Sequence, residues 1–127
     1  MYYKTMLDTE RYLSLEHIPF KHKIAFSKFR CSNHKLNVEI GRQSNIVFDD
    51  RLCNFCLDSN NIRVIDCEFH AFFHCLKYRE TRTQYLFNWY HGGNSISDFY
   101  SLMGSTNDKI THKVTTFVYH LLNNINS

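Results

Sequence analysis

The chain has 127 residues, of which 43% are hydrophobic and 16% aromatic, with a single proline. This composition excludes a disordered chain and suits one folded domain, residues 1–127. The net charge of +3 is too small to indicate a nucleic-acid partner by itself. No apolar run reaches the about 18 residues of a membrane span, and we recognise no secretory leader. We therefore expect an intracellular protein, nuclear or cytoplasmic, with no membrane partner.

Residues 5–42 are expected to contain N-terminal helices and a basic segment. Apolar side chains at helical spacing predict one helix over residues 5–16 and a second, after Pro19, over residues 20–31. Between residues 32 and 41, apolar and polar side chains alternate, which favours a short strand. His34 lies in this stretch, and a structural hydrogen bond is its expected role.

The segment from Phe20 to Arg42 concentrates positive charge. Its basic residues are Lys21, Lys23, Lys28, Arg30, Lys35 and Arg42, interleaved with Phe20, Phe26 and Phe29. Cations of this kind bind phosphates, and exposed aromatic rings stack on unpaired bases. The alternative is an amphipathic helix whose aromatic residues lie in the core and whose lysines are solvated.

Residues 43–90 are expected to contain a zinc knuckle followed by an aromatic helix. Cys53 and Cys56 are separated by two residues, a spacing that turns both sulfurs toward one point. Further candidate ligands follow at Cys67, His70, His74 and Cys75. On a regular helix, His70 and Cys75 point roughly 140° apart, which favours Cys67, His70 and His74 unless the chain turns before Cys75. The ligand set stays open on geometry alone.

The elements around these ligands complete a predicted α+β fold, mainly α with a small zinc-stapled hairpin, in one compact domain. A turn at residues 58–61 and a return strand at 62–65 would form the hairpin. Asp66 is a candidate N-cap for a helix reaching about Tyr90, bent near Cys75. Helices over residues 95–125 follow, the first stopped at Gly104 and the last with a clear apolar stripe.

The ligand pattern resembles a known family. Cys53-x2-Cys56, His70-x4-Cys75, Tyr78 and Arg82 resemble the Cys-Cys-His-Cys region near the C-terminus of reverse transcriptases of non-LTR retrotransposons. Upstream residues from Phe29 to Arg42 and downstream residues from Phe99 to Met103 also resemble such retroelement-derived proteins of invertebrates. Two features depart from the pattern: Leu76 stands where proline is common, and the loop between Cys56 and His70 is long.

The resemblance implies one structural Zn²⁺ held by Cys53, Cys56, His70 and Cys75. It also implies a non-enzymatic domain that assists RNA or DNA binding through the basic residues of the 20–42 segment. We find no phosphate-binding glycine loop, nucleophile motif or His-Glu-x2-His helix, so we expect neither catalysis nor a small-molecule substrate. The alternative is a zinc-stabilised protein-interaction module, or a degenerate retroelement fragment that binds no nucleic acid.

Overall fold

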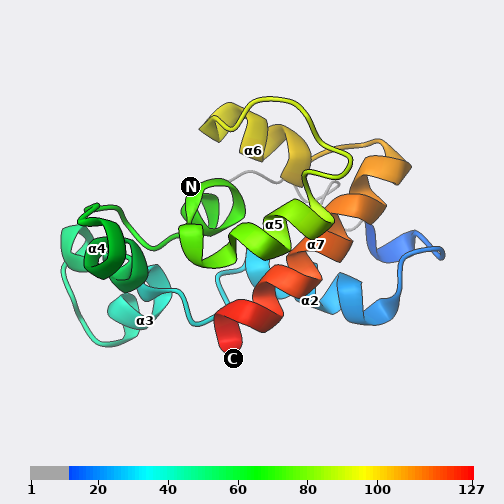
Figure 1. Cartoon of the computed structure of the whole chain (residues 1–127). Helices are drawn as coiled ribbons and strands as arrows, with labels where there is room; N and C mark the ends of the chain where they lie inside the picture. The colour runs from blue at the N-terminus through cyan, green and yellow to red at the C-terminus, as the bar shows by residue number, and fades with distance from the viewer. Residues whose placement is uncertain (1–11) are drawn as a thin grey trace.

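The structure, a computed structural model, describes residues 12–127 and is organised around the long C-terminal helix α7, Asp108–Asn126. Helices α2 (Phe20–Arg30), α5 (Arg79–Tyr85) and α6 (Ile96–Met103) pack against α7 and form a helical bundle with it (Figure 1). The mainly helical class predicted from the sequence is confirmed.

Helices α2, α6 and α7 begin where local chemistry predicts. The buried stripe of α7 includes Val114, Phe117, Val118, Leu121 and Ile125. The Asn107 side chain accepts hydrogen bonds from two backbone N–H groups in the first turn of this helix. Ser95 and Asp98 form a capping box at the start of α6, which ends at Gly104. Helix α2 follows Pro19 as expected.

Phenylalanine rings fill the centre of the bundle. Phe72 meets Phe99 and Phe117 edge to face, with ring centroids 5.1 and 4.9 Å apart. Aromatic rings prefer this arrangement because the positive edge of one ring faces the negative face of the other. All three residues are fully buried, as is Phe29 of α2, so the bundle has a dry, well-packed core.

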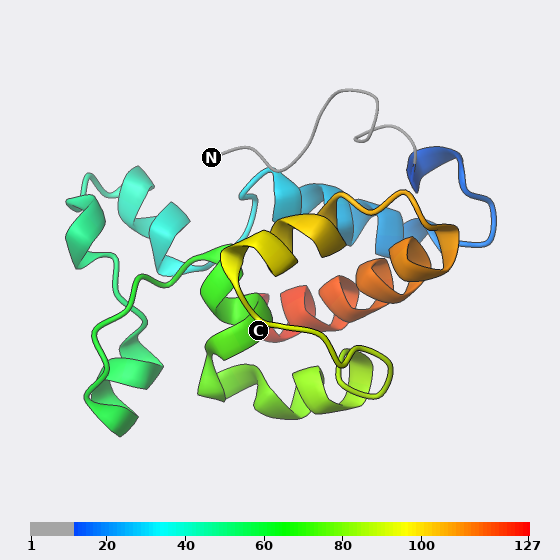
Figure 2. The same cartoon turned by 90° about the horizontal axis from the view of Figure 1, so that it is seen from above.

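Residues 37–66 project from one end of the bundle as a small lobe, which we call the lobe (Figure 2). It contains α3 (Asn37–Gln43), η2 (Phe48–Asp50) and α4 (Asn54–Asn60). The strand predicted over residues 32–41 is therefore wrong, because most of its alternating stretch lies in α3. Alternation over so few residues did not decide between a strand and one short helix.

The short helix α3 is held at its first turn by Asp66. Its carboxylate accepts a hydrogen bond from the Asn37 N–H at 2.8 Å, and its carbonyl accepts one from the Val38 N–H at 3.0 Å. Asp66 thus caps α3 across the lobe instead of capping the helix that follows it, so the N-cap prediction is wrong. The following helical segment begins at Glu68.

The predicted hairpin is reduced to one antiparallel bridge between Leu52 and Ile65. In the part of the chain that the structure describes, no longer strand pairing surrounds this bridge. Residues 58–60, predicted as part of a turn, continue α4 instead, and Asn61 ends it in the left-handed conformation with φ 54°. The bridge still holds the start of α4 against the return chain, with the Cys53 N–H 2.9 Å from the Val64 carbonyl.

The long aromatic helix predicted up to Tyr90 is broken rather than bent. A π-helical turn, η3 (His70–His74), is followed by an extended residue at Cys75 with ψ 123°. The short helix η4 (Leu76–Tyr78) then leads into α5, which ends at Tyr85.

The predicted helix over residues 5–16 lies mostly outside the described residues. Its last part contains only the 3-10 turn η1 (Tyr12–Ser14). Within residues 12–127, no helix is both long enough and apolar enough to cross a lipid bilayer.

Candidate metal centre

Two of the candidate ligands come from the lobe. Cys53 directly precedes α4, and Cys56 lies in its first turn. The hydrogen bonds of the Leu52–Ile65 bridge fix the chain just before the helix, and the helical turn then places both sulfurs on the same side. Both cysteines are buried, at 4% and 2% exposure.

The other two candidate ligands come from the π turn at the edge of the bundle. The N–H of Cys75 donates to the His70 carbonyl at 2.7 Å, a bond between residues five apart. A π turn is wider than an α turn, so residues five apart come closer to the same side than on a regular helix. The break at Cys75 therefore removes the geometric objection to pairing His70 with Cys75.

The four ligand atoms form a compact group within 4.8 Å of one another. Cys53 Sγ lies 3.6 Å from Cys75 Sγ, and Cys56 Sγ lies 3.9 Å from Cys75 Sγ and 3.4 Å from His70 Nε2. Ordinary zinc bond lengths in a tetrahedron place two sulfurs about 3.8 Å apart and a sulfur and a nitrogen about 3.6 Å apart. Cys53, Cys56, His70 and Cys75 are thus spaced to hold a metal ion.

The electrostatics of the thiols agree with this spacing. The Cys53 and Cys75 thiols are in hydrogen-bond contact, and this contact lowers the pKa of Cys53 and raises the pKa of Cys75. The two shifts belong to the pair and not to either thiol alone. A bound cation would displace the thiol protons, since metal ligands must be deprotonated.

The structure favours Cys75 over the two competing candidate ligands, Cys67 and His74. Cys67 is only partly buried and lies outside the group, and burial raises the pKa of its thiol. His74 is exposed, and its Nε2 lies 3.0 Å from the Asn94 carbonyl. Regular helix geometry favoured Cys67 and His74, whereas the resemblance favoured Cys75, and the π turn explains the difference.

Arg82 braces the π turn from inside the bundle. Its guanidinium donates to the Phe72, Ala71 and Cys75 carbonyls at 3.0, 3.0 and 2.8 Å. These carbonyls lie at the end of the turn, where backbone acceptors need partners. Burial lowers the pKa of Arg82, while Cys75 and Cys56 oppose that shift. Sequence reasoning singled out Arg82 in the family pattern but gave it no role.

A buried polar group ties the site to the preceding segment. Glu68 accepts hydrogen bonds from Ser32 at 2.7 Å and from His34 Nε2 at 2.6 Å. The Leu36 N–H donates to His34 Nδ1, so the proton of the neutral ring lies on Nε2. His34 thus has the structural role predicted for it. Sequence reasoning missed Glu68 as its partner, because 34 residues separate the two.

Gly41 allows the lobe to close on itself. A Cβ atom at this position would lie 2.5 Å from Arg51 Cγ, so any larger residue would displace the Arg51 side chain. Arg51 crosses this glycine and donates to the Ile46 and Val38 carbonyls at 2.9 and 3.2 Å. These backbone contacts hold the Arg51 side chain against the lobe.

The basic residues predicted to bind nucleic acid are spread over several environments. Arg30 is buried, with its guanidinium over the Tyr12 and Phe26 rings. Arg42 pairs with Glu39 in the lobe.

The four lysines of this set are all at least partly exposed. Lys21 and Lys28 are exposed along one groove between α2 and α7. Lys23 donates a hydrogen bond to the Leu13 carbonyl, and Lys35 donates hydrogen bonds to Asn126 at the C-terminal end of α7.

Comparisons with protein-family models, with curated proteins and with solved structures find no match to this chain. The resemblance to retroelement reverse transcriptases therefore stays a prediction from the sequence.

Proposed function

We propose that this chain is a non-enzymatic domain in which Cys53, Cys56, His70 and Cys75 hold one structural Zn²⁺. The spacing of the four ligand atoms carries the proposal, because three of their six separations are close to the edges of a zinc tetrahedron and all lie within 4.8 Å. Soft thiolates with one imidazole suit zinc better than the oxygen-loving cations. Four protein ligands fill the coordination sphere, so no position is left for a reacting water.

Charge balance supports the same proposal. Zn²⁺ with three thiolates and one neutral imidazole carries one net negative charge. Arg82, buried beside the π turn, carries one positive charge and bonds to the carbonyl of the ligand Cys75. A buried charge is tolerated when an opposite charge and hydrogen bonds accompany it, so the metal centre and Arg82 would stabilise each other.

We further propose that the domain assists binding of single-stranded RNA or DNA, as the retroelement resemblance implies. The exposed lysines Lys21 and Lys28 support this proposal, since both line the groove between α2 and α7. Phe20, at the start of α2, is 74% exposed and offers a ring for stacking on a base, whereas Phe26 and Phe29 belong to the core.

Salt dependence tests this second proposal. Fluorescence anisotropy of a labelled oligonucleotide should show binding that weakens steeply as salt rises, because phosphate contacts release counterions. The double variant Lys21→Glu and Lys28→Glu should abolish the binding, whereas Lys77→Glu together with Arg79→Glu, which reverses two exposed charges outside the groove, should have a smaller effect. Absence of binding at low salt, or salt-independent binding, would contradict the proposal.

A protein-interaction module remains the second candidate, and the lobe favours it. Large apolar side chains are exposed there at Ile40, Ile46, Val47, Phe48, Phe55 and Ile62. Exposed apolar groups gathered in one small region often mark a protein partner. The charge-reversal variants separate the two candidates, because they would leave a hydrophobic partner bound while removing nucleic acid.

A further inference from the structure

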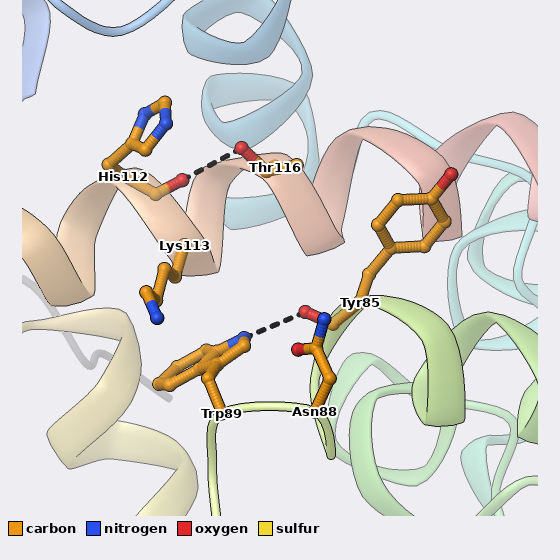
Figure 3. Close-up of a pocket in the computed structure, with 6 residues that line it drawn as sticks. All are labelled: Tyr85, Asn88, Trp89, His112, Lys113 and Thr116. Carbon is orange, nitrogen blue, oxygen red and sulfur yellow. Dashed lines mark hydrogen bonds between the residues drawn. The ribbon is translucent and has the colours of Figure 1, made fainter.

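A pocket of about 320 Å³ lies between the end of α5 and the middle of α7 (Figure 3). Ligand pockets in proteins commonly begin near 300 Å³, so this one suits a small flat group better than a large molecule. Its lining residues are Tyr85, Asn88, Trp89, His112, Lys113 and Thr116. The lining contains two large aromatic rings and a lysine but no carboxylate.

The Trp89 ring is held in place before any ligand arrives. Its indole Nε1 donates to the Tyr85 carbonyl at 2.8 Å, and its backbone N–H donates to the Leu86 carbonyl at 3.2 Å. A ring fixed in this way loses little conformational freedom when a ligand stacks on it. Figure 3 shows Trp89 and Asn88 on one side of the pocket, facing Lys113 and Thr116 of α7 on the other.

The groups around Trp89 suit the parts of a nucleotide. Lys113 is exposed, and its ammonium group lies over the indole ring, 5.5 Å from the ring centre. A base that stacks on this face would displace the ammonium group, which the flexible side chain can then place beside the adjacent phosphate. Asn88 is also exposed, and its amide can donate to and accept from the edge of a base. Aromatic stacking, amide hydrogen bonds and a nearby cation together distinguish a nucleotide from a purely apolar ligand.

The pocket and the groove that contains Lys21 and Lys28 are separate, and aromatic rings of α7 connect their linings. The Tyr85 ring stacks on His120 with centroids 3.8 Å apart and an angle of 10° between the rings. On the other side of α7, the Lys21 ammonium lies 5.1 Å from the centre of the Tyr119 ring. A series of rings thus runs from the pocket across α7, with Lys113 at one end and Lys21 at the other, and surfaces that bind a single strand combine rings and cations in this way.

We infer that the Trp89 pocket binds one unpaired base of a single-stranded nucleic acid, with Lys113 contacting an adjacent phosphate. The inference rests on the nucleic-acid binding proposed above, and it adds a stacking site formed by α5 and α7 that lies outside the 20–42 segment. The strand would run from this pocket across α7 toward Lys21 and Lys28.

Trp89 also supplies the probe for the test, because it is the only tryptophan in the sequence. Its fluorescence is followed at low salt while an unlabelled octauridylate is added to the zinc-loaded protein, and binding is measured separately by anisotropy with a labelled octamer. Stacking of a base should quench the tryptophan in parallel with binding. Trp89→Leu should weaken binding roughly ten-fold, as expected when one stacked base is lost, whereas Trp89→Phe should retain most of it.

Lys113→Gln should weaken binding and reduce its salt dependence by about one phosphate contact. Lys77→Gln, which removes the same charge outside the pocket, should have a smaller effect on both. Melting temperature and zinc content of each variant identify any loss of folding. Binding without tryptophan quenching, and unchanged in Trp89→Leu, overturns the pocket but leaves the proposed function intact. Failure of the octamer to bind at low salt overturns both.

Discussion

The bundle and the lobe bury very different kinds of residue. In the bundle, phenylalanine and aliphatic side chains pack around α7, with Phe29, Phe72, Phe99 and Phe117 fully buried. Within residues 37–66, the buried hydrophobic residues are Cys53 and Cys56, while larger apolar side chains reach solvent. The bundle can thus be stabilised by ordinary apolar burial, whereas the lobe depends on a few polar contacts and on the proposed metal.

The metal centre lies where the two regions meet. Cys53 and Cys56 belong to the lobe, whereas His70 and Cys75 belong to the segment that enters the bundle. A bound ion would therefore fasten the lobe to a core that is already packed. Removing the metal and damaging the core should therefore affect different parts of the molecule.

Removal of the metal should have the largest effect. Zinc binding to small structural sites is worth about 10 kcal/mol or more, which is comparable to the stability of a small domain. A chelator should greatly accelerate amide hydrogen exchange in residues 37–66 while α7 keeps most of its protection. Hydrogen exchange followed by mass spectrometry measures both regions in one sample. Equal loss of protection in both regions would show that the metal stabilises the bundle as much as it stabilises the lobe.

Truncation of the bundle core should have the next largest effect. Phe117→Ala should destabilise the protein by about 3–5 kcal/mol, because it removes a fully buried ring and leaves a cavity. Urea unfolding measures the change, and chelator should not alter it substantially. Phe55→Ala in the lobe, where the side chain is 40% exposed, is the control and should cost much less. Similar costs for the two substitutions would contradict the comparison.

Loss of Arg82 should have a smaller effect that involves both regions. Arg82→Met retains much of the side-chain volume but leaves the Ala71, Phe72 and Cys75 carbonyls without their donor, at a cost of about 1–3 kcal/mol. Because the π turn then loses its brace, zinc affinity should also fall. Competition with a zinc-binding dye measures this affinity. Arg79→Met, at an exposed position, should leave affinity unchanged, and an unchanged affinity in Arg82→Met would remove the bracing role.

Acid should weaken the contact between α2 and α7 by the smallest amount. Burial, followed by the charges of Lys21, His120 and His112, lowers the pKa of His22. The unfolded chain therefore binds a proton more readily, and stability is lost as pH falls from about 6.5 toward the lower folded pKa. Urea unfolding of metal-free protein should show this slope, and His22→Gln should reduce it. An equal slope in both proteins would exclude His22 as its source.

The bundle is the part of the fold that the sequence predicts best. The apolar stripe of α7, the capping box at Ser95 and the position of Pro19 are local signals, and each marks the element that forms. The lobe is predicted less well because its structure depends on contacts between distant residues. Helix α3 starts where Asp66 caps it, and local alternation of side chains does not contain that information.

The candidate metal centre was predictable in part. The spacing of Cys53 and Cys56 indicates a shared ligand site, and the family resemblance selects Cys75 over Cys67. Regular helix geometry favoured Cys67, because the π turn that brings His70 and Cys75 together is braced by Arg82, seven residues beyond Cys75. A buried arginine bonded to three carbonyls leaves no recognisable local pattern.

The zinc content of three proteins decides whether Cys75 belongs to the metal centre. Elemental analysis of purified wild-type protein, Cys75→Ser and Cys67→Ser gives the number of zinc ions per chain in each. The proposed ligand set predicts one zinc per chain in the wild type and in Cys67→Ser, and a large loss in Cys75→Ser. A metal-free wild type, or loss of zinc from Cys67→Ser with retention in Cys75→Ser, would contradict it.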